Sequence, residues 1–199
     1  MTKLVVFDMG GVLFEFQGDR LIAETSQRAR RWRSDEVQKR WIPLAREFET
    51  GVVTEGEFAE AVVRTYELEL TASGFLVAFR DAAVGYYAGA VDLVREIAVQ
   101  HRVISLSNTN PVQWPAVLAG LGERDPFFAH HPSHLSGFHK PDPRAFAALH
   151  ELYGKALEFY FFDDRADNVA AARAAGFHAR RTRGVLEART ACVEFGLFA

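Results

Sequence analysis

What the sequence has little of already limits what this protein can be. Its 199 residues include one cysteine, Cys192, so no disulfide can form within the chain, and this composition fits a reducing compartment. No apolar stretch approaches the roughly 20 residues that a membrane-spanning helix requires. The first residues lead into a short apolar run without the charged and long apolar regions of a secretory signal. We therefore expect a cytoplasmic protein that has no membrane partner.

Excess charge of one sign is also missing. The net charge is −3, and the longest basic stretch, residues 28–33, is interrupted by Ala29 and Trp32. Such a stretch is typical of a solvated helix face rather than a surface for nucleic acid, so no nucleic-acid partner is expected. With 49% apolar and 25% charged residues, the chain can bury one core and carry a sizeable insertion. We expect a monomer or a weak dimer.

The most informative stretch is residues 3–14, where an apolar run leads into Asp8 and then into Gly10 and Gly11. An apolar run without alternation suits a strand that is covered on both faces of a parallel sheet, and such sheets bind ligands at the carboxyl ends of their strands. The two glycines allow a tight turn and a close approach of the backbone to a ligand. Taken alone, Asp8 is explained equally well as the start of a turn.

The rest of the chain predicts a helical insertion in an α/β pattern. Residues 17–85 show helical spacing of apolar residues, a capping-box signature from Thr54 to Glu57, and no strand. Helices and strands then alternate, with helices at 91–97, 111–120, 143–153 and 165–175 and strands at 102–107, 127–131, 159–162 and 177–181. Single helices between strands imply right-handed crossovers and a parallel sheet. The sequence therefore predicts an α/β fold. It has a Rossmann-like three-layer core, residues 1–16 and 86–199, and an α-helical cap, residues 17–85, inserted after the first strand.

Polar residues follow four predicted strands. They are Asp8, the pair Ser107 and Asn108, Lys140, and the pair Asp163 and Asp164. A parallel sheet brings all of these strand ends to one edge. Carboxylates, a lysine, a hydroxyl and free backbone N–H groups suit a phosphate monoester together with Mg²⁺, a hard cation that prefers oxygen ligands. Each member alone has a structural explanation, such as a helix cap or an acidic pair at a helix N-terminus. Their combination favours a catalytic site.

The order of these residues resembles the four motifs of the haloacid dehalogenase-like (HAD-like) hydrolases. The motifs are Asp8 in a Phe-Asp-x-x-Gly-Val frame, Ser107-Asn108, Lys140-Pro141, and Phe162-Asp163-Asp164, and the resemblance spans the whole chain. Within that superfamily, residues 106–110, 140–143 and 161–168 resemble the bacterial α-D-glucose-1-phosphate phosphatases and, more distantly, the N-terminal phosphatase domain of soluble epoxide hydrolase. The resemblance implies a Mg²⁺-dependent phosphatase that acts on a small phosphate ester, for example a sugar phosphate such as glucose 1-phosphate.

The resemblance also implies a role for each residue. Asp8 would attack phosphorus and form an aspartyl-phosphate, and Lys140 would offset the repulsion between the two anions. Ser107, the Asn108 N–H and Lys140 would bind the phosphate oxygens. Asp167 would help to hold Lys140 in place.

The implied metal ligands are Asp8, the Gly10 carbonyl and Asp164, with Asp163 reaching Mg²⁺ through water or orienting its ligands. One departure from the family pattern lies at Gly10, where its phosphatases usually carry a second aspartate as general acid and base. Such catalysis is typically worth about 10²–10⁴ in rate, so poor leaving groups would suffer most. The glucose-1-phosphate phosphatases resemble this chain in having glycine there. Glu15 is a possible substitute, although an acidic residue there more often fixes the turn beneath the cap.

Two further groups of residues are candidates for the site. The first consists of four histidines whose spacing mixes strand and loop without a clear ligand pattern: His130, His131, His134 and His139. We interpret them as solvent-side or substrate-adjacent residues. The second is Arg46 and Glu49 of the predicted cap, which could reach substrate hydroxyls, although a surface ion pair is the simpler interpretation.

Three other functions remain open. A 2-haloacid dehalogenase of the same family also lacks the second aspartate, but it needs no metal, and its fourth motif looks like Ser-Asn followed by one aspartate rather than by Asp163 and Asp164. A non-catalytic phosphate-binding protein would fit Gly10, yet it should also lose Asp8 or Lys140. A receiver-type phospho-acceptor domain has a different chain order and no helical insertion.

Overall fold

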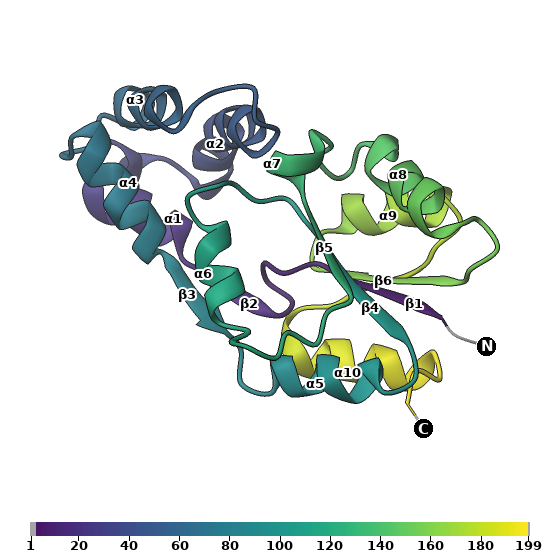
Figure 1. The fold of residues 1–199 in the computed structure, drawn as a ribbon. Coiled ribbons are helices and arrows are strands. Elements are labelled where there is room, and N and C mark those ends of the chain that lie inside the picture. Colours follow the sequence, from purple (N-terminus) through teal and green to yellow (C-terminus); the bar gives the residue numbers. More distant parts are fainter. Residues whose placement is uncertain (1–2, 199) are drawn as a thin grey trace.

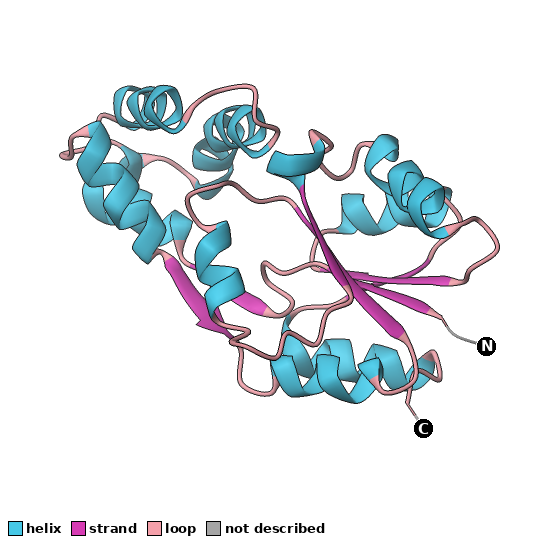
Figure 2. Cartoon of the chain, viewed as in Figure 1, coloured by secondary structure: helices cyan, strands magenta, loops and turns pink. Residues whose placement is uncertain are grey.

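The computed structural model describes residues 3–198, and within them all side chains except those of Asp19, Arg30 and Ser34. Its centre is a five-stranded parallel sheet with the spatial order β5-β4-β1-β6-β7 (Figures 1 and 2). The strands are β1 (Leu4–Phe7), β4 (Arg102–Ser107), β5 (Ala129–Pro132), β6 (Phe159–Asp163) and β7 (His178–Arg181). The predicted α/β fold with a parallel sheet is confirmed.

Helices cover both faces of this sheet and give the core three layers. One face carries α5 (Ala90–Ala98) and α10 (Gly184–Glu194), and the other carries α8 (Pro143–Tyr153) and α9 (Ala166–Ala174) (Figure 1). In β1, Val5 and Phe7 pack toward α5 and α10, whereas Leu4 and Val6 pack toward α8 and α9. None of these four residues is exposed to solvent. Burial on both faces explains why the apolar run of β1 does not alternate with polar residues.

The order of the strands reverses at β1, because β4 and β5 lie on one side of it and β6 and β7 on the other. Phe7 pairs in register with Ser105 of β4 and with Phe162 of β6. The carboxyl ends of these three strands therefore meet at one edge of the sheet. In open α/β sheets, ligands bind in the crevice at such a reversal point.

A helical unit is inserted between β2 (Phe14–Phe16) and β3 (Ala83–Tyr86). Its members are α1 (Gly18–Thr25), the short 3₁₀-helix η1 (Ala29–Arg31), α2 (Ser34–Glu49), α3 (Glu55–Tyr66) and α4 (Ala72–Asp81). We call residues 18–81 the helical insert; Figure 1 shows it beside the sheet rather than on either face. It has its own apolar cluster, in which Phe48 stacks on Phe58 with ring centroids 4.4 Å apart. The predicted capping box is present, since the Thr54 hydroxyl accepts a hydrogen bond from the Glu57 N–H at 3.3 Å.

Some elements differ from the sequence-based expectation. Residues 83–85 belong to a strand, β3, which pairs antiparallel with β2, so the expectation of no strand in residues 17–85 is wrong there. This ribbon is short, and β3 acquires its partner only through tertiary contact with residues 14–16. The helix expected at 111–120 is α6 (Trp114–Ala119), because the Asn110 side chain accepts from the Gln113 N–H at 3.0 Å and turns the chain first.

Two helices were not expected at all, namely α7 (Ser133–Ser136) and α10. α7 is a single turn, and α10 buries mainly small residues such as Ala188 and Ala191, which leave a weak helical pattern in the sequence. Within residues 3–198, no helix combines the length and the hydropathy needed to span a bilayer.

Candidate active site

Asp8 directly follows β1 and is 7% exposed. Its Oδ1 accepts a hydrogen bond from the Met9 N–H at 2.8 Å and lies 3.0 Å from the Lys140 Nζ. No described residue donates a hydrogen bond to Oδ2. One carboxylate oxygen is thus fixed by the protein while the other remains available for chemistry.

The two glycines after Asp8 have different structural roles. Gly11 has a φ of +71°, and a Cβ placed on it would lie 2.8 Å from Oδ2 of Asp164, so only glycine fits there without displacing that carboxylate. At Gly10 a Cβ would only meet the ring of Phe16, at 3.4 Å. Gly11 therefore allows close packing of the Asp8 loop against Asp164, whereas a Cβ at Gly10 would contact only Phe16.

Lys140 is 1% exposed and its ammonium group is surrounded by three acceptors. Its Nζ lies 2.6 Å from the Leu106 carbonyl oxygen, 2.7 Å from Oδ2 of Asp163 and 3.0 Å from Oδ1 of Asp8. Burial alone would lower the pKa of Lys140, but the adjacent carboxylates of Asp163 and Asp8 raise it above its usual value. Lys140 is therefore a fixed positive charge between the two aspartates.

Asp163 is fully buried and holds Lys140 in place. Its carboxylate also accepts hydrogen bonds from the Arg165 N–H at 2.9 Å and from the Asn168 Nδ2, which lies 3.0 Å from each oxygen. The expectation that Asp167 holds Lys140 is wrong, because Asp167 forms a half-exposed ion pair with Arg165 at 2.8 Å. Sequence reasoning missed Asn168. The available signal was its place in the first turn of α9, five residues after Asp163, from which an amide can reach back to the strand end.

The three aspartates form a group that could hold a metal ion. Asp8, Asp163 and Asp164 offer carboxylate oxygens that all lie within 4.8 Å of one another. Burial raises the pKa of Asp8 to about 8, an effect that Lys140 opposes and the nearby Asp163 charge strengthens. Burial and Asp163 also raise the pKa of Asp164. One lysine does not balance three carboxylates, so this all-oxygen group fits a hard dication such as Mg²⁺.

The residues after β4 complete this edge of the sheet. Ser107 is the last residue of β4 and is buried. The Asn108 side chain fixes the backbone of Lys140, since its Nδ2 donates to the Lys140 carbonyl at 2.9 Å and its Oδ1 accepts from the Lys140 N–H at 2.8 Å. Asp8, Asn108, Lys140, Asp163 and Asp164 thus lie together at this edge of the sheet, and Ser107 directly precedes Asn108 at the end of β4.

A cavity of about 810 Å³ opens above these residues, between the sheet edge and the helical insert. Its floor includes Asp8, Gly10, Asn108, Lys140 and Asp164. The insert contributes an apolar and aromatic wall together with several polar side chains, among them Trp41, Ile42, Phe79, Arg46 and Glu49. A small molecule bound at Asp8 would therefore lie against the insert.

Comparison with known proteins identifies the family. The sequence matches the haloacid dehalogenase-like hydrolases over residues 2–176, which is most of its length. This chain belongs to the haloacid dehalogenase-like hydrolases. The resemblance to this family is thus confirmed, and the chain is a hydrolase.

Solved structures support the fold of this HAD-like hydrolase. One is a HAD family enzyme from Bacteroides thetaiotaomicron in complex with magnesium and inorganic phosphate, at 22% identity and a TM-score of 0.73, covering 92% of this chain and 95% of that one. Another, from Porphyromonas gingivalis and described as a predicted HAD-like family hydrolase, has 26% identity and a TM-score of 0.70, with 92% of each chain covered. The L-2-haloacid dehalogenase from Xanthobacter autotrophicus has 27% identity and a TM-score of 0.64, covering 92% of this chain and 78% of that one.

Glu49 does not form the expected surface ion pair in this hydrolase. Its Oε2 lies 2.9 Å from the Nε2 of His139, and both side chains are largely buried, at 17% and 15% exposed. The other three clustered histidines make contacts elsewhere: His130 with Ser105 and Asp125, His131 with Tyr153, and His134 with the Thr109 carbonyl. Of the four, only His139 lines the cavity.

Glu15 does not line the cavity either. It lies in β2, and its Oε1 accepts a hydrogen bond from the Gln17 side chain at 2.7 Å. This contact fixes the turn into the helical insert, which is the structural role that the sequence favoured for an acidic residue at this position.

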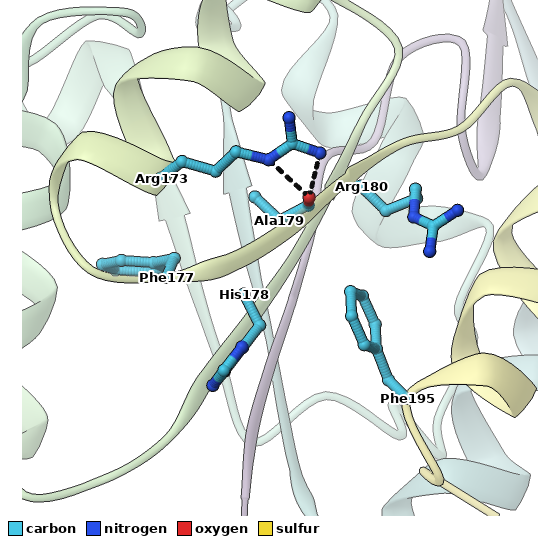
Figure 3. A pocket seen from close by; sticks show the side chains of 6 residues that line it. All are labelled: Arg173, Phe177, His178, Ala179, Arg180 and Phe195. Atoms are coloured by element: carbon cyan, nitrogen blue, oxygen red, sulfur yellow. Dashed lines mark hydrogen bonds between the residues drawn. The ribbon is translucent and has the colours of Figure 1, made fainter.

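A second, shallower depression lies along the edge strand β7, away from Asp8 (Figure 3). Its cationic side chains already have partners. Arg173 donates two hydrogen bonds to the Ala179 carbonyl, at 3.0 and 2.7 Å, and Arg180 forms an ion pair with Glu194 at 2.6 Å. These contacts tie α9 and α10 to the sheet, so we assign this depression a structural role.

Proposed function

We propose that this hydrolase is a Mg²⁺-dependent phosphatase that hydrolyses a small phosphate monoester through an aspartyl-phosphate on Asp8. The observation that carries this proposal is the environment of Asp8 itself. One of its oxygens is bound by the Met9 N–H and Lys140, the other accepts no hydrogen bond from the described residues, and the carboxylate forms the floor of a cavity beside Asp164. This is the geometry of a positioned nucleophile next to a site for a cation.

In the first step, Asp8 attacks phosphorus, an Asp8 oxygen–phosphorus bond forms, and the bond from phosphorus to the leaving oxygen breaks. Water then attacks phosphorus, the Asp8 oxygen–phosphorus bond breaks, and inorganic phosphate and free Asp8 are released. The leaving alkoxide takes up a proton from solvent, and the attacking water returns one, so that the products are an alcohol and phosphate. Lys140 opposes the rise that burial causes in the pKa of Asp8 and aligns its carboxylate, and the Asn108 N–H with Ser107 would hold the phosphate oxygens. Bound Mg²⁺, held by Asp8, Asp164 and the Gly10 carbonyl, would supply the charge that the phosphate and the carboxylates lack.

The glycine at position 10 restricts which leaving groups the proposed reaction can expel. Because no carboxylate stands two residues after Asp8, the leaving oxygen departs with little proton donation from that position. This favours esters whose leaving hydroxyl is acidic, such as the anomeric hydroxyl of a sugar. We therefore propose a sugar phosphate of the glucose 1-phosphate type as the substrate.

A second candidate is a 2-haloacid dehalogenase. It is favoured by Gly10 and by the similarity to the Xanthobacter autotrophicus enzyme. The adjacent carboxylates Asp163 and Asp164 argue against it, because a second carboxylate beside Asp8 serves a cation more readily than it serves an attack on a carbon–halogen bond.

One experiment distinguishes the proposed phosphatase from a 2-haloacid dehalogenase. The purified protein is offered p-nitrophenyl phosphate, glucose 1-phosphate and 2-chloropropionate, each with Mg²⁺ or with EDTA. We expect phosphate release that EDTA abolishes, no chloride release, and no turnover by Asp8→Asn, which removes the nucleophile but little volume. Phosphatase activity that survives EDTA, or aspartyl-phosphate trapped in Asp8→Asn, would contradict the proposal.

A further inference from the structure

The helical insert contacts the catalytic edge of the sheet through a buried pair of side chains. Glu49, the last residue of α2, lies 2.9 Å from the Nε2 of His139, which directly precedes Lys140. A second link is formed on another part of the insert, where the Gln113 Nε2 donates to the Phe79 carbonyl at 2.8 Å. Of these two hydrogen bonds, only the one made by Glu49 reaches the loop that carries Lys140.

The hydrogen bonds around His139 fit a single arrangement of protons. A carboxylate only accepts, so the His139 Nε2 carries the proton that it donates to Glu49, and in the neutral ring Nδ1 is then an acceptor. The Asn108 Nδ2 lies 3.2 Å from that Nδ1 and donates to it. The same amide nitrogen donates its other proton to the Lys140 carbonyl at 2.9 Å. Both protons of the amide are thus used, and donation runs from Asn108 through His139 to Glu49.

This chain of hydrogen bonds ends at the nucleophile. The Asn108 side chain holds both the N–H and the carbonyl of Lys140, at 2.8 and 2.9 Å. The Lys140 Nζ in turn lies 3.0 Å from Oδ1 of Asp8. Because the Lys140 side chain is completely enclosed, a shift of its backbone has to move its ammonium group or strain its contacts.

We propose that Glu49 is a positioning residue for the reaction: through His139 and Asn108, it fixes the Lys140 loop and so aligns Lys140 with Asp8 while the insert is docked on the core. This inference deepens the proposed phosphatase function, and its kinetic test depends on that function. Glu49 belongs to the insert, so the alignment of the catalytic lysine depends on where the insert lies.

The kinetic test replaces Glu49 by alanine. With p-nitrophenyl phosphate as substrate, we expect Glu49→Ala to lower kcat about tenfold or more and to change KM by less than about twofold, because misalignment of the Lys140 ammonium group with Oδ1 of Asp8 affects the attack on phosphorus more than it affects binding of the ester. Glu49→Gln retains an oxygen that accepts from Nε2 and should restore most of kcat. Glu47→Ala is the matched control, since Glu47 is exposed on the same helix. An unchanged kcat, or a loss confined to KM, would overturn the proposal.

A double-mutant cycle tests whether Glu49 acts through His139. If it does, the double variant Glu49→Ala/His139→Ala loses no more kcat than His139→Ala alone, because the second change removes a contact that is already broken. If the loss of kcat in the double variant equals the product of the two single losses, Glu49 acts independently of His139, and the proposal is overturned.

A third measurement does not depend on activity. In nitrogen NMR, the wild-type His139 ring should be neutral with its proton on Nε2. Glu49→Ala should give a mixture of tautomers and shift the side-chain amide signal of Asn108, whereas Glu47→Ala should leave both unchanged. An Asn108 signal that Glu49→Ala leaves in place would overturn the proposal. If these signals behave as expected while no phosphate ester is turned over by the wild type, the positioning contact stands and the proposed phosphatase function fails.

Discussion

The substitution Gly10→Asp would restore the carboxylate that the family's phosphatases usually carry. The backbone at Gly10 does not have the positive φ of Gly11, and a Cβ there meets only the edge of the Phe16 ring, at 3.4 and 3.6 Å. The side chain can therefore enter the cavity above Asp8 without disturbing the backbone. Burial and the neighbouring carboxylates, which raise the pKa of Asp8, would also favour the protonated form of the new aspartate, and this is the form that a general acid needs.

The size of the effect should depend on the leaving group. General acid catalysis is worth about 10²–10⁴ in rate, and the gain is largest where the leaving oxygen is least acidic. We expect Gly10→Asp to raise kcat for glucose 6-phosphate by about tenfold to a hundredfold and to raise it much less for glucose 1-phosphate. The wild type, which lacks this proton donor, should prefer glucose 1-phosphate.

The assay measures phosphate release from both esters for the wild type, Gly10→Asp and Gly10→Asn. Asparagine has nearly the same size as aspartate but cannot donate a proton as an acid, so it separates acid catalysis from filling of the cavity. Equal gains on the two esters, gains that Gly10→Asn reproduces, or a wild-type preference for glucose 6-phosphate would refute the reasoning. The substrate preference would then come from contacts with the helical insert.

Three further predictions concern the site and its support. Saturating Mg²⁺, at about 100 times its Kd, should raise the melting temperature by about 5–10 °C, because binding adds about 2.7 kcal/mol to the free energy of unfolding. Asp164→Asn should remove most of that rise. Gly11→Ala should lower the free energy of unfolding by about 1–2 kcal/mol, because alanine is strained in the left-handed backbone conformation of this position. It should also weaken Mg²⁺ binding, because the new Cβ displaces Asp164. Asn168→Ala should cost about 2 kcal/mol, or about 4–8 °C in melting temperature, since it removes hydrogen bonds to the buried carboxylate of Asp163. The control for this third prediction is Asp167→Ala, which should leave the free energy of unfolding almost unchanged because the ion pair of Asp167 is half exposed.

Thermal melting with a Mg²⁺ titration checks all three. If Asp164→Asn retains the rise in melting temperature caused by Mg²⁺, the cation binds at a site that does not include Asp164. Gly11→Ala with unchanged Mg²⁺ affinity would show that Asp164 adjusts freely to a new side chain. If Asp167→Ala destabilises the protein as much as Asn168→Ala, the assignment of Asn168 as the support of Asp163 is incorrect.

The sequence by itself determined the class of the fold and the residues of the catalytic edge. An apolar run that ends in Asp8 predicts a strand buried on both faces, and helices between strands require parallel pairing, so the polar residues at the strand ends had to meet. Asp8, Lys140, Asp163 and Asp164 could be placed together because this inference needs only strand order and chain direction, which are encoded locally in hydrophobic patterns and turn residues.

Only the tertiary structure decided how the side chains pair. Asp167 and Asn168 are neighbours in the same helical turn, yet of the two only Asn168 contacts Asp163. The sequence pattern does not show which of two adjacent helical residues faces a given strand end. Likewise, the partner of Glu49 is His139, 90 residues away, rather than the nearby Arg46. β3 is a strand only because it meets β2 after the chain returns from the insert. Such pairings depend on how separate elements pack in space, and for that reason the sequence supplied the catalytic residues whereas the packing determined what holds them in position.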